Sequence, residues 1–197
     1  MATGEKVGII GSGNVGSALA RGLQRAGRDV RTTGKDPDEV RDVAAWADVV
    51  ILAVPFGALD DVASRIRASV GRNTVVIDVT NALTSEMKLA LGYTNSGAEE
   101  LQKKLPGTRV VKAFNTQFAQ HMDSGRLGDR PLTVFAAGDD ADAKRVALEL
   151  AKAIGFDAVD AGPLQNARLL EPLGVLNIQL GYGLGLGTQI GLQLVRR

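Results

Sequence analysis

Short apolar runs alternate with amphipathic stretches along most of the chain. The apolar runs predict strands at residues 6–10, 29–33, 48–55, 74–80, 109–114, 132–138 and 157–162. Stretches with helical spacing of apolar positions predict helices at residues 14–27, 36–47, 58–70 and 140–155. Strands that alternate with helices require crossover connections of one hand. The pattern therefore predicts an α/β fold with a doubly wound, mostly parallel sheet of the Rossmann type.

Two segments depart from this alternation. Residues 86–107 are the most polar stretch, and we expect a surface helix and loop there. Residues 172–195 carry no formal charge, a run that is long enough to cross a bilayer. Amide side chains interrupt this run at Asn177, Gln179, Gln189 and Gln193. Because amides without partners are costly in hydrocarbon, we predict a buried helix followed by a glycine-rich segment, and no membrane span.

Composition narrows the functional class. The 23 basic and 22 acidic residues give a net charge of +1, which offers no electrostatic argument for binding nucleic acid or a membrane surface. The absence of cysteine excludes disulfides, thiolate metal sites and Cys nucleophiles, and it fits a cytoplasmic location. The opening residues lack a long apolar region, so we expect no signal peptide. We expect residues 1–197 to form a single domain, with 164–197 as a small C-terminal appendage.

The strongest chemical signal lies between the first predicted strand and the first predicted helix. There Gly11, Gly13 and Gly16 have the spacing GxGxxG. Gly11 permits a tight turn, Gly13 lets the backbone approach a pyrophosphate, and Gly16 allows the helix to pack closely on the strand. The helix N-terminus offers free N–H groups to an anion. Further candidate ligands of the pyrophosphate are Ser12, Asn14 and Val15. The alternative, glycines that only form a tight turn, is disfavoured by the strand–turn–helix placement.

The end of the second predicted strand bears on which nucleotide binds. A carboxylate at this place hydrogen-bonds the ribose 2′-hydroxyl of NAD, whereas a cation favours a 2′-phosphate. Here the chain has Thr33, Gly34 and Lys35, which offer a hydroxyl, a bare N–H and an ammonium group. This arrangement predicts NADP(H). In the alternative, Lys35 is solvated and Asp36 contacts the ribose, but Asp36 precedes Pro37 at a helix start, where we expect an N-cap.

Three further strand ends supply candidates, because ligands of open α/β sheets gather beyond the carboxyl ends of the strands. After the third strand come Val54, Pro55, which stiffens the turn, and Phe56, a flat surface for the adenine or diphosphate. Candidates to line the reaction site are Asn81, Asn115, Thr116 and Gln117. In the alternative, these amides satisfy loop backbone.

The sequence does not supply an evident acid–base catalyst or metal site. His121 is the single histidine, and its polar surroundings predict a surface residue and not a catalytic base. No metal-binding motif or GxSxG is present. Hydride transfer between two redox cofactors has less need of such a group, because the acceptor ring delocalises charge and positioning supplies most of the rate. We therefore predict no catalytic side chain and no metal.

Several stretches together resemble the family of coenzyme F420-dependent NADP oxidoreductases, whose members pass hydride between NADPH and a deazaflavin. They are GSGNVGSALARGL, VVKAFNT and above all VDAGPLQNARLLEPL. The likeness runs from about Lys6 to the C-terminus, and the segment at residues 160–171 is much more specific than GxGxxG. The resemblance implies NADP as cofactor, coenzyme F420 as co-substrate, a homodimer, and a deazaflavin pocket shaped by the glycine-rich C-terminal part.

The resemblance also implies individual roles. The pyrophosphate ligands would be Ser12 to Val15, the 2′-phosphate ligands Gly34 and Lys35, the sugar contacts Val54 and Pro55, and the nicotinamide neighbours Ala113 to Thr116. Two departures matter. Relatives typically have Gly-Ser-Arg at Thr33, Gly34 and Lys35, and Lys lacks the bidentate fork of Arg. A His of some deazaflavin-using relatives corresponds to Asn115, which makes the hydride acceptor less secure than the nucleotide.

The leading hypothesis is an NADP-dependent oxidoreductase that exchanges hydride with coenzyme F420. A second hypothesis has a flavin, an imine or another small acceptor, since reductase domains that pass electrons to flavin and iron share the AFNT phrase. A third is a non-catalytic module that senses NADP(H). The polar and glycine-rich strand ends favour an enzyme.

Overall fold

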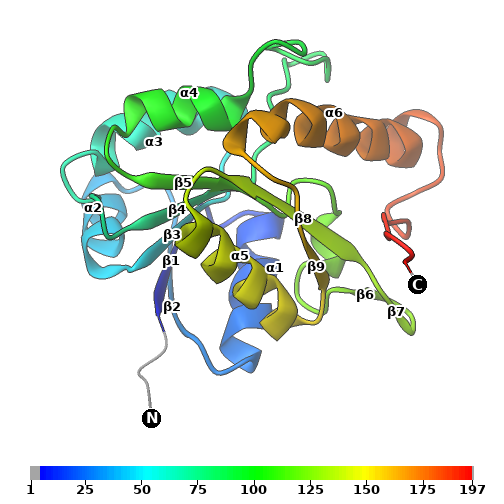
Figure 1. The fold of residues 1–197 in the computed structure, drawn as a ribbon, viewed down its shortest axis with the longest axis horizontal. Helices are drawn as coiled ribbons and strands as arrows, with labels where there is room; N and C mark the ends of the chain where they lie inside the picture. Colours follow the sequence, from blue (N-terminus) through cyan, green and yellow to red (C-terminus); the bar gives the residue numbers. More distant parts are fainter. Residues whose placement is uncertain (1–4, 197) are drawn as a thin grey trace.

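The computed structural model describes residues 5–196, and a seven-stranded sheet forms its centre (Figure 1). The strand order is β2-β1-β3-β4-β5-β8-β9. The strands are β1 (Lys6–Ile10), β2 (Asp29–Thr33), β3 (Val49–Leu52), β4 (Val75–Asp78), β5 (Arg109–Lys112), β8 (Thr133–Gly138) and β9 (Asp157–Asp160). Neighbouring strands of this sheet are parallel, except that β8 runs antiparallel to β5. The predicted mostly parallel α/β fold is confirmed.

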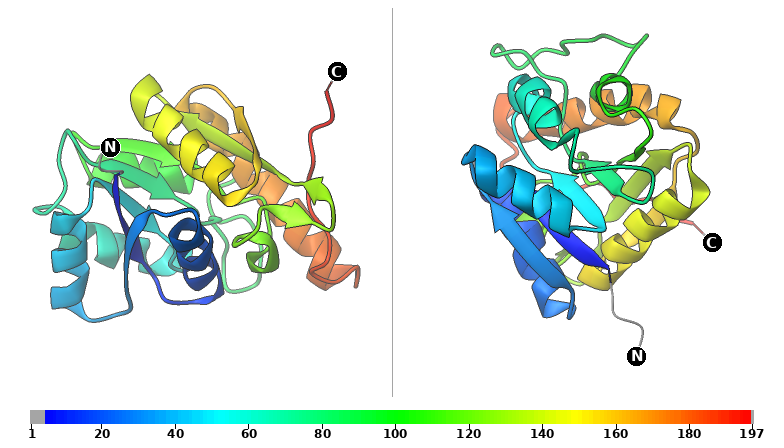
Figure 2. Two further views of the ribbon diagram at one scale, coloured as in Figure 1. Left: turned by 90° about the horizontal axis from the view of Figure 1, so that it is seen from below. Right: turned by 90° about the vertical axis from the view of Figure 1, so that its left-hand side faces the viewer.

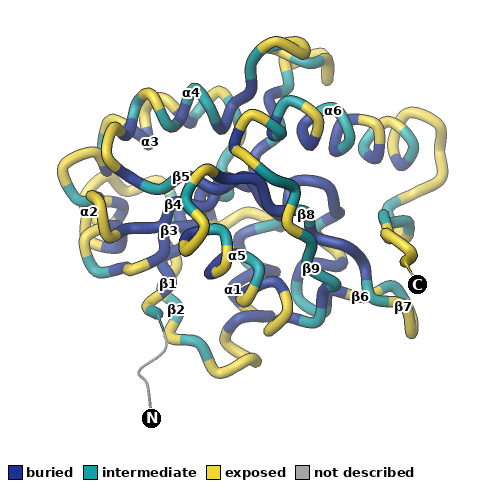
Figure 3. Tube along the Cα trace, in the orientation of Figure 1, coloured by how far each residue is buried: buried dark blue, intermediate teal, exposed yellow. Residues whose placement is uncertain are grey.

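Helices cover both faces of the sheet (Figure 2). They are α1 (Asn14–Arg25), α2 (Pro37–Trp46), α3 (Leu59–Ile66), α4 (Gly97–Lys104), α5 (Ala141–Ile154) and α6 (Ala167–Ile178). The core on one face contains side chains of α1 and α5, such as Leu19 and Leu150. The core on the other face contains side chains of α2, α3 and α4, such as Val40, Ile66 and Leu101. Because both faces are covered, all four residues of β3 are buried (Figure 3).

The ends of the elements follow local chemistry. Asp36 precedes α2, and its Oδ1 accepts hydrogen bonds from the backbone N–H groups of Asp38 at 2.9 Å and Glu39 at 3.1 Å. The predicted N-cap is therefore present. Helix α5 begins after Asp140, whose Oδ1 accepts from Ala143 N at 2.8 Å, and it ends at a glycine with positive φ.

Local patterns misplaced some elements. The third predicted strand, 48–55, ends at Leu52, so residues 53–55 lie in the loop above the sheet. Within residues 86–107 the helix is α4, which connects β4 with β5 and buries Ala98 and Leu101 in the core. A short antiparallel pair, β6 (Arg126–Leu127) and β7 (Arg130–Pro131), was not predicted, because two-residue strands carry no periodic signal.

The C-terminal segment packs against the sheet domain. Helix α6 lies beside α4 (Figure 1), a π-helical turn (Gln179–Gly183) follows it, and the chain then returns to β8. There Thr133 N donates to Leu192 O at 2.9 Å, and Leu194 N donates to Thr133 Oγ1 at 2.8 Å. Across residues 5–196, no helix combines the length and apolar character that a membrane crossing requires.

The sheet topology determines where a ligand can bind. The strand order reverses between β1 and β3, so the crossover helices leave in opposite directions at that point. In open α/β sheets this switch point opens a crevice at the carboxyl ends of the strands. The glycine turn after β1 and the loops after β3, β4 and β5 all lie at this edge.

Candidate functional site

The glycine turn between β1 and α1 is sterically demanding, as the sequence predicts. Gly11 has φ +120°, and a Cβ at this position would collide with the carbonyl oxygen of Ala53. A Cβ at Gly16 would collide with the carbonyl oxygen of Gly11. A side chain at either position would force the strand, turn and helix apart. Gly13 differs, because a Cβ there would meet no protein atom within 4 Å. Its backbone is therefore open to a ligand.

The N-terminus of α1 presents an anion-binding arrangement. Gly13 is its N-cap, no side chain caps it, and no acidic residue lies in its first turn. Ser12 and Asn14 are exposed and Val15 is half-buried. The uncapped N–H groups and the helix dipole together favour a negative charge at this end. These features fit the diphosphate of a dinucleotide.

The turn after β2 lies against the glycine turn. Gly11 N donates to Thr33 O at 3.0 Å, and a Cβ on Gly34 would lie 3.4 Å from Ser12 Oγ. Thr33 is buried, and its hydroxyl donates to Glu39 Oε2 at 3.1 Å. The hydroxyl is thus already engaged, whereas Lys35 is exposed. The ammonium group and the Gly34 backbone are the groups of this turn that face outward.

Two adjoining cavities occupy the crevice. One, of about 360 Å³, lies between the glycine turn and the loop after β3, and Val54, Pro55 and Phe56 line it. The other, of about 260 Å³, lies at the ends of β4 and β5 under α6. The walls that both cavities share are Asn14, Val15, Val79, Asn81 and Ile178. The two cavities thus join the glycine turn from Gly13 to Val15 and the loop after β3 to the predicted substrate-lining residues, whereas the turn from Thr33 to Lys35 lines neither of them.

The predicted substrate-lining residues Asn81, Asn115, Thr116 and Gln117 all line the second cavity. Their amides, however, are bound to protein. Asn81 Nδ2 donates to Asn115 O and Asn115 Nδ2 donates to Asn81 Oδ1, both at 2.9 Å. Gln117 Nε2 donates to Thr133 O at 2.8 Å, and Gln117 Oε1 accepts from Leu192 N at 3.2 Å. These amide N–H groups hold loop backbone in place, as in the alternative that the sequence left open, whereas Asn115 Oδ1 is buried and has no hydrogen-bond partner among residues 5–196.

Hydroxyl groups at the same edge are not satisfied by the protein. Thr80 Oγ1 and Thr116 Oγ1 are buried and have no hydrogen-bond partner among residues 5–196. Thr80 lines the first cavity and Thr116 the second. A buried hydroxyl without a partner is destabilising. A polar ligand in the crevice would relieve this cost.

The backbone at the end of β5 is strained. Buried Phe114 has φ +64°, a conformation that a bulky residue rarely adopts. Such strain costs on the order of 1–3 kcal/mol and concentrates at functional sites. The turn directs the chain from Ala113, which is buried at the strand end, into the residues that line the second cavity.

The C-terminal segment forms the other wall of the second cavity through Gly174, Asn177, Ile178 and Tyr182. Helix α6 approaches closely at Gly174, where a Cβ would lie 2.7 Å from Asn115 O. Asn177 Nδ2 donates to Thr116 O at 3.1 Å.

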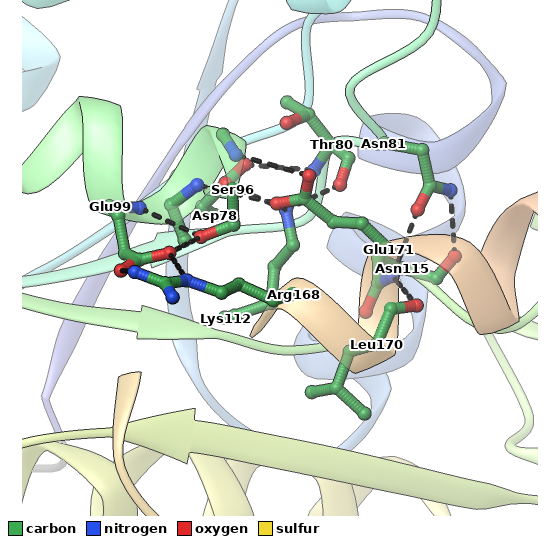
Figure 4. A network of polar contacts seen from close by, with 12 residues as sticks. Asp78, Thr80, Asn81, Ser96, Glu99, Lys112, Asn115, Arg168, Leu170 and Glu171 are labelled. Carbon is green, nitrogen blue, oxygen red and sulfur yellow. Dashed lines mark hydrogen bonds and ion pairs between the residues drawn. The ribbon is translucent and has the colours of Figure 1, made fainter. Parts of the chain in front are cut away.

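A buried ion cluster behind the cavity was not predicted (Figure 4). Lys112, the last residue of β5, is fully buried. Its Nζ lies 2.8 Å from Asp78 Oδ2 at the end of β4 and 2.9 Å from Glu171 Oε1 on α6, and it donates to Thr80 O at 2.6 Å. Burial alone would lower the pKa of Lys112, but the charges of Asp78 and Glu171 outweigh it and raise the pKa above its ordinary value.

Glu171 also joins α6 to α4. Its Oε2 accepts from Gly97 N at 3.1 Å and its Oε1 from Ala98 N at 3.3 Å, both at the start of α4. One turn earlier, Arg168 donates to Glu99 through Nε at 2.9 Å and Nη2 at 2.7 Å (Figure 4). These contacts fix α6 over the ends of β4 and β5. Arg168 and Glu171 both lie in the segment at residues 160–171 that the sequence analysis singled out.

The sequence contained a signal for this cluster. Lys112 ends the apolar run VVK, and Glu171 stands between Leu170 and Pro172 in an otherwise apolar stretch. A charge within each of two apolar segments indicates a buried pair. Their partnership, however, depends on the tertiary arrangement.

The prediction that His121 is a surface residue is wrong. His121 is 3% exposed, and its Nε2 lies 3.0 Å from Thr188 O. A carbonyl oxygen only accepts hydrogen bonds, so Nε2 carries the proton. The physical reason for the error is the glycine-rich C-terminal segment, which folds back over a turn that looks polar in the local sequence.

Comparisons with known proteins agree with this architecture. Residues 6–46 and 39–82 match the family model described as NADP oxidoreductase, coenzyme F420-dependent. The F420-dependent NADP reductase of Methanothermobacter marburgensis is 29% identical, over 89% of this chain and 92% of that protein. The crystal structure of a candidate F420-dependent NADP-reductase from Arthrobacter sp. FB24 superposes with a TM-score of 0.89 at 27% identity, over 98% of this chain and 100% of that one.

A different kind of relative is also similar. Metalloreductase STEAP3 of Rattus norvegicus is 31% identical over 85% of this chain, but the match includes only 36% of that protein. The chain thus spans about a third of the length of the metalloreductases that it matches.

The chain has a Rossmann-type fold, and its sequence is similar to NADP oxidoreductases and to metalloreductases. The matches confirm the predicted resemblance to the coenzyme F420-dependent NADP oxidoreductase family.

Proposed function

We propose that the protein transfers a hydride between NADP(H) and coenzyme F420. The observation that carries this proposal is the pair of adjoining cavities, one at the glycine turn and one under α6, which share part of their walls. A dinucleotide along the first would bring its reactive ring toward the second, where a second flat ligand can bind. Ligand sites at a topological switch point have this form.

The proposed nucleotide contacts follow the crevice from end to end. Backbone amides from Ser12 to Val15 bind the diphosphate at the start of α1. Gly34 and Lys35 bind the 2′-phosphate, and Val54 and Pro55 contact the sugar. The open backbone of Gly13 and the unpaired hydroxyls of Thr80 and Thr116 fit a polar ligand here.

NADP(H) supplies the hydride when bound, and the protein supplies position. The strained turn at Phe114 and the interlocked amides of Asn81 and Asn115 hold the wall of the second cavity rigid. Fixed walls keep two planar groups in one orientation, which is where most of the rate of such a transfer arises. Helix α6 covers this end and limits access of water.

An acceptor screen tests the proposal. Protein mixed with NADPH and coenzyme F420 should bleach the deazaflavin absorbance. Turnover with FMN or ferric chelate and none with F420 would instead favour the second candidate, for which the 31% identity to a metalloreductase is the supporting observation. Absence of turnover with every acceptor, combined with tight NADPH binding, would favour a sensor.

The nucleotide assignment has its own test. Replacing Lys35 with Glu should weaken NADPH binding far more than NADH binding, because a contact of this kind contributes about 1.5–3 kcal/mol and the new carboxylate repels a phosphate. Equal losses for the two nucleotides in a titration would contradict the 2′-phosphate assignment.

We also propose a homodimer that forms through the C-terminal segment. Leu169 and Leu176 lie one above the other on α6 and are 66% and 55% exposed, and Leu184 and Leu186 beyond it are exposed as well. An exposed apolar face of this kind favours a protein partner. Light scattering should give twice the 20.6 kDa mass of the chain, and a Leu169→Lys, Leu176→Lys variant should give the single mass.

A further inference from the structure

Arg65 on α3 reaches the turn that carries Lys35. Its Nη1 donates to Lys35 O at 3.2 Å, although Lys35 lies in the turn between β2 and α2 and Arg65 in α3. Its Nη2 lies 2.7 Å from Asp61 Oδ2, one helical turn earlier. The side chain is 29% exposed, so it is partly covered and still open to solvent. The guanidinium group is thus held beside the turn for which we propose 2′-phosphate binding.

Two cationic side chains lie beside this turn. Lys35 is exposed and forms no ion pair within residues 5–196. Asp36 and Glu39 accept hydrogen bonds within their own helix region, whereas Asp61 pairs with Arg65 and offsets part of its charge. A phosphate at this turn would therefore have the Lys35 ammonium group on one side and the Arg65 guanidinium group on the other.

We propose that Arg65 is a specificity-determining residue that binds the 2′-phosphate of NADP together with Lys35; the inference rests on the proposed function. A guanidinium group has five N–H donors, and the contacts with Lys35 O and Asp61 use two of them. The remaining donors form a planar fork that suits a phosphate, which the ammonium group of Lys35 cannot provide. Asp61 holds the fork in place before the ligand arrives, which lowers the entropic cost of binding.

A merely structural role for Arg65 predicts a different result. The bond to Lys35 O could serve only to fix the turn, and adenine could stack on the guanidinium plane. Stacking would affect NADPH and NADH equally, because both nucleotides share the adenosine. A role confined to holding Lys35 in place would weaken NADPH binding in the wild type but not in a Lys35→Gln background, whereas a direct phosphate contact weakens it in both. A phosphate contact affects NADPH alone.

The test compares Arg65→Gln with Arg67→Gln by calorimetric titration with NADPH, NADH and 2′,5′-ADP. Arg67 follows α3 as its C-cap residue, is exposed, and its change removes the same charge. Arg65→Gln should weaken the binding of NADPH and of 2′,5′-ADP about tenfold or more and leave the binding of NADH unchanged. It should also reduce the salt dependence of NADPH binding. Arg67→Gln should bind all three as the wild type does.

Equal weakening of NADPH and NADH by Arg65→Gln, or no weakening of either, would overturn the inference. A parallel Lys35→Gln variant separates its failure from that of the proposed function. If Lys35→Gln weakens NADPH selectively and Arg65→Gln does not, the inference about Arg65 alone is wrong. If the wild-type protein does not prefer NADPH to NADH, both the inference and the 2′-phosphate assignment fail.

Discussion

Replacing Lys112 with Met should strongly destabilise the fold. The change removes the cation between Asp78 and Glu171 and keeps a long unbranched side chain, so two carboxylates remain buried without their partner. Breaking a buried ion pair on one side costs about 3–5 kcal/mol, because the desolvated charge is left uncompensated. In a chain of this length each kcal/mol lowers Tm by about 2–4 °C, which predicts a fall of roughly 6–20 °C.

Thermal and urea unfolding followed by circular dichroism measure this loss. Lys103→Met is the control, since Lys103 pairs with Glu100 at 2.6 Å but is 65% exposed. An exposed pair of this kind contributes less than about 1 kcal/mol. The double variant Lys112→Met, Glu171→Gln should be more stable than Lys112→Met, because it removes one uncompensated charge while the amide oxygen still accepts from the start of α4.

The reasoning is refuted if Lys112→Met costs no more than Lys103→Met. It is also refuted if the losses of Lys112→Met and Glu171→Gln simply add in the double variant, since residues of one buried network should be energetically coupled.

Two further predictions concern the glycine turn and the attachment of α6. Gly16→Ala should weaken NADPH binding and lower Tm, because the new methyl group collides with Gly11 O. Gly57→Ala should do neither, because the space around its Cβ is open. An NADPH titration that Gly16→Ala leaves unchanged would contradict the close packing. The hydrogen bond from Arg168 holds the pKa of Glu99 below its ordinary value of 4.5 and outweighs burial. The ion pair therefore stabilises the fold above pH 4.5, and this contribution is lost as the pH falls through the folded-state pKa of Glu99. Arg168→Gln should flatten the acid side of the plot of unfolding free energy against pH. Identical plots for the variant and the wild type would contradict this prediction.

Recognition of the fold depended on features that repeat along the chain. Apolar runs such as residues 6–10 and 74–80 must be strands covered on both faces, and the intervening helices then require parallel crossovers. The turn at Gly11 and Gly16 was equally predictable, because its steric demand is local. The N-cap at Asp36 belongs to the same group, since capping involves residues within one turn of helix.

The candidate site was predicted less completely. Asn81 and Asn115 line one cavity, as expected for residues after neighbouring strands, since parallel strands bring their carboxyl ends to one edge of the sheet. The sequence left open whether these amides face a ligand or hold loop backbone. It misjudged His121, and it did not reveal that Arg65 approaches Lys35, because these contacts join segments far apart in the chain.

The order of apolar, polar and glycine residues by itself determined the α/β fold, the mostly parallel sheet and the tight glycine turn before α1. These features follow from backbone geometry and from the burial of one face of each element, which act within a few residues. Only the tertiary structure decided that Lys112 and Glu171 are partners, that the C-terminal segment covers His121, and that α6 closes the second cavity. Each of these requires groups separated by many residues to meet, and their charges and hydrogen bonds gain strength only once folding has removed water from between them.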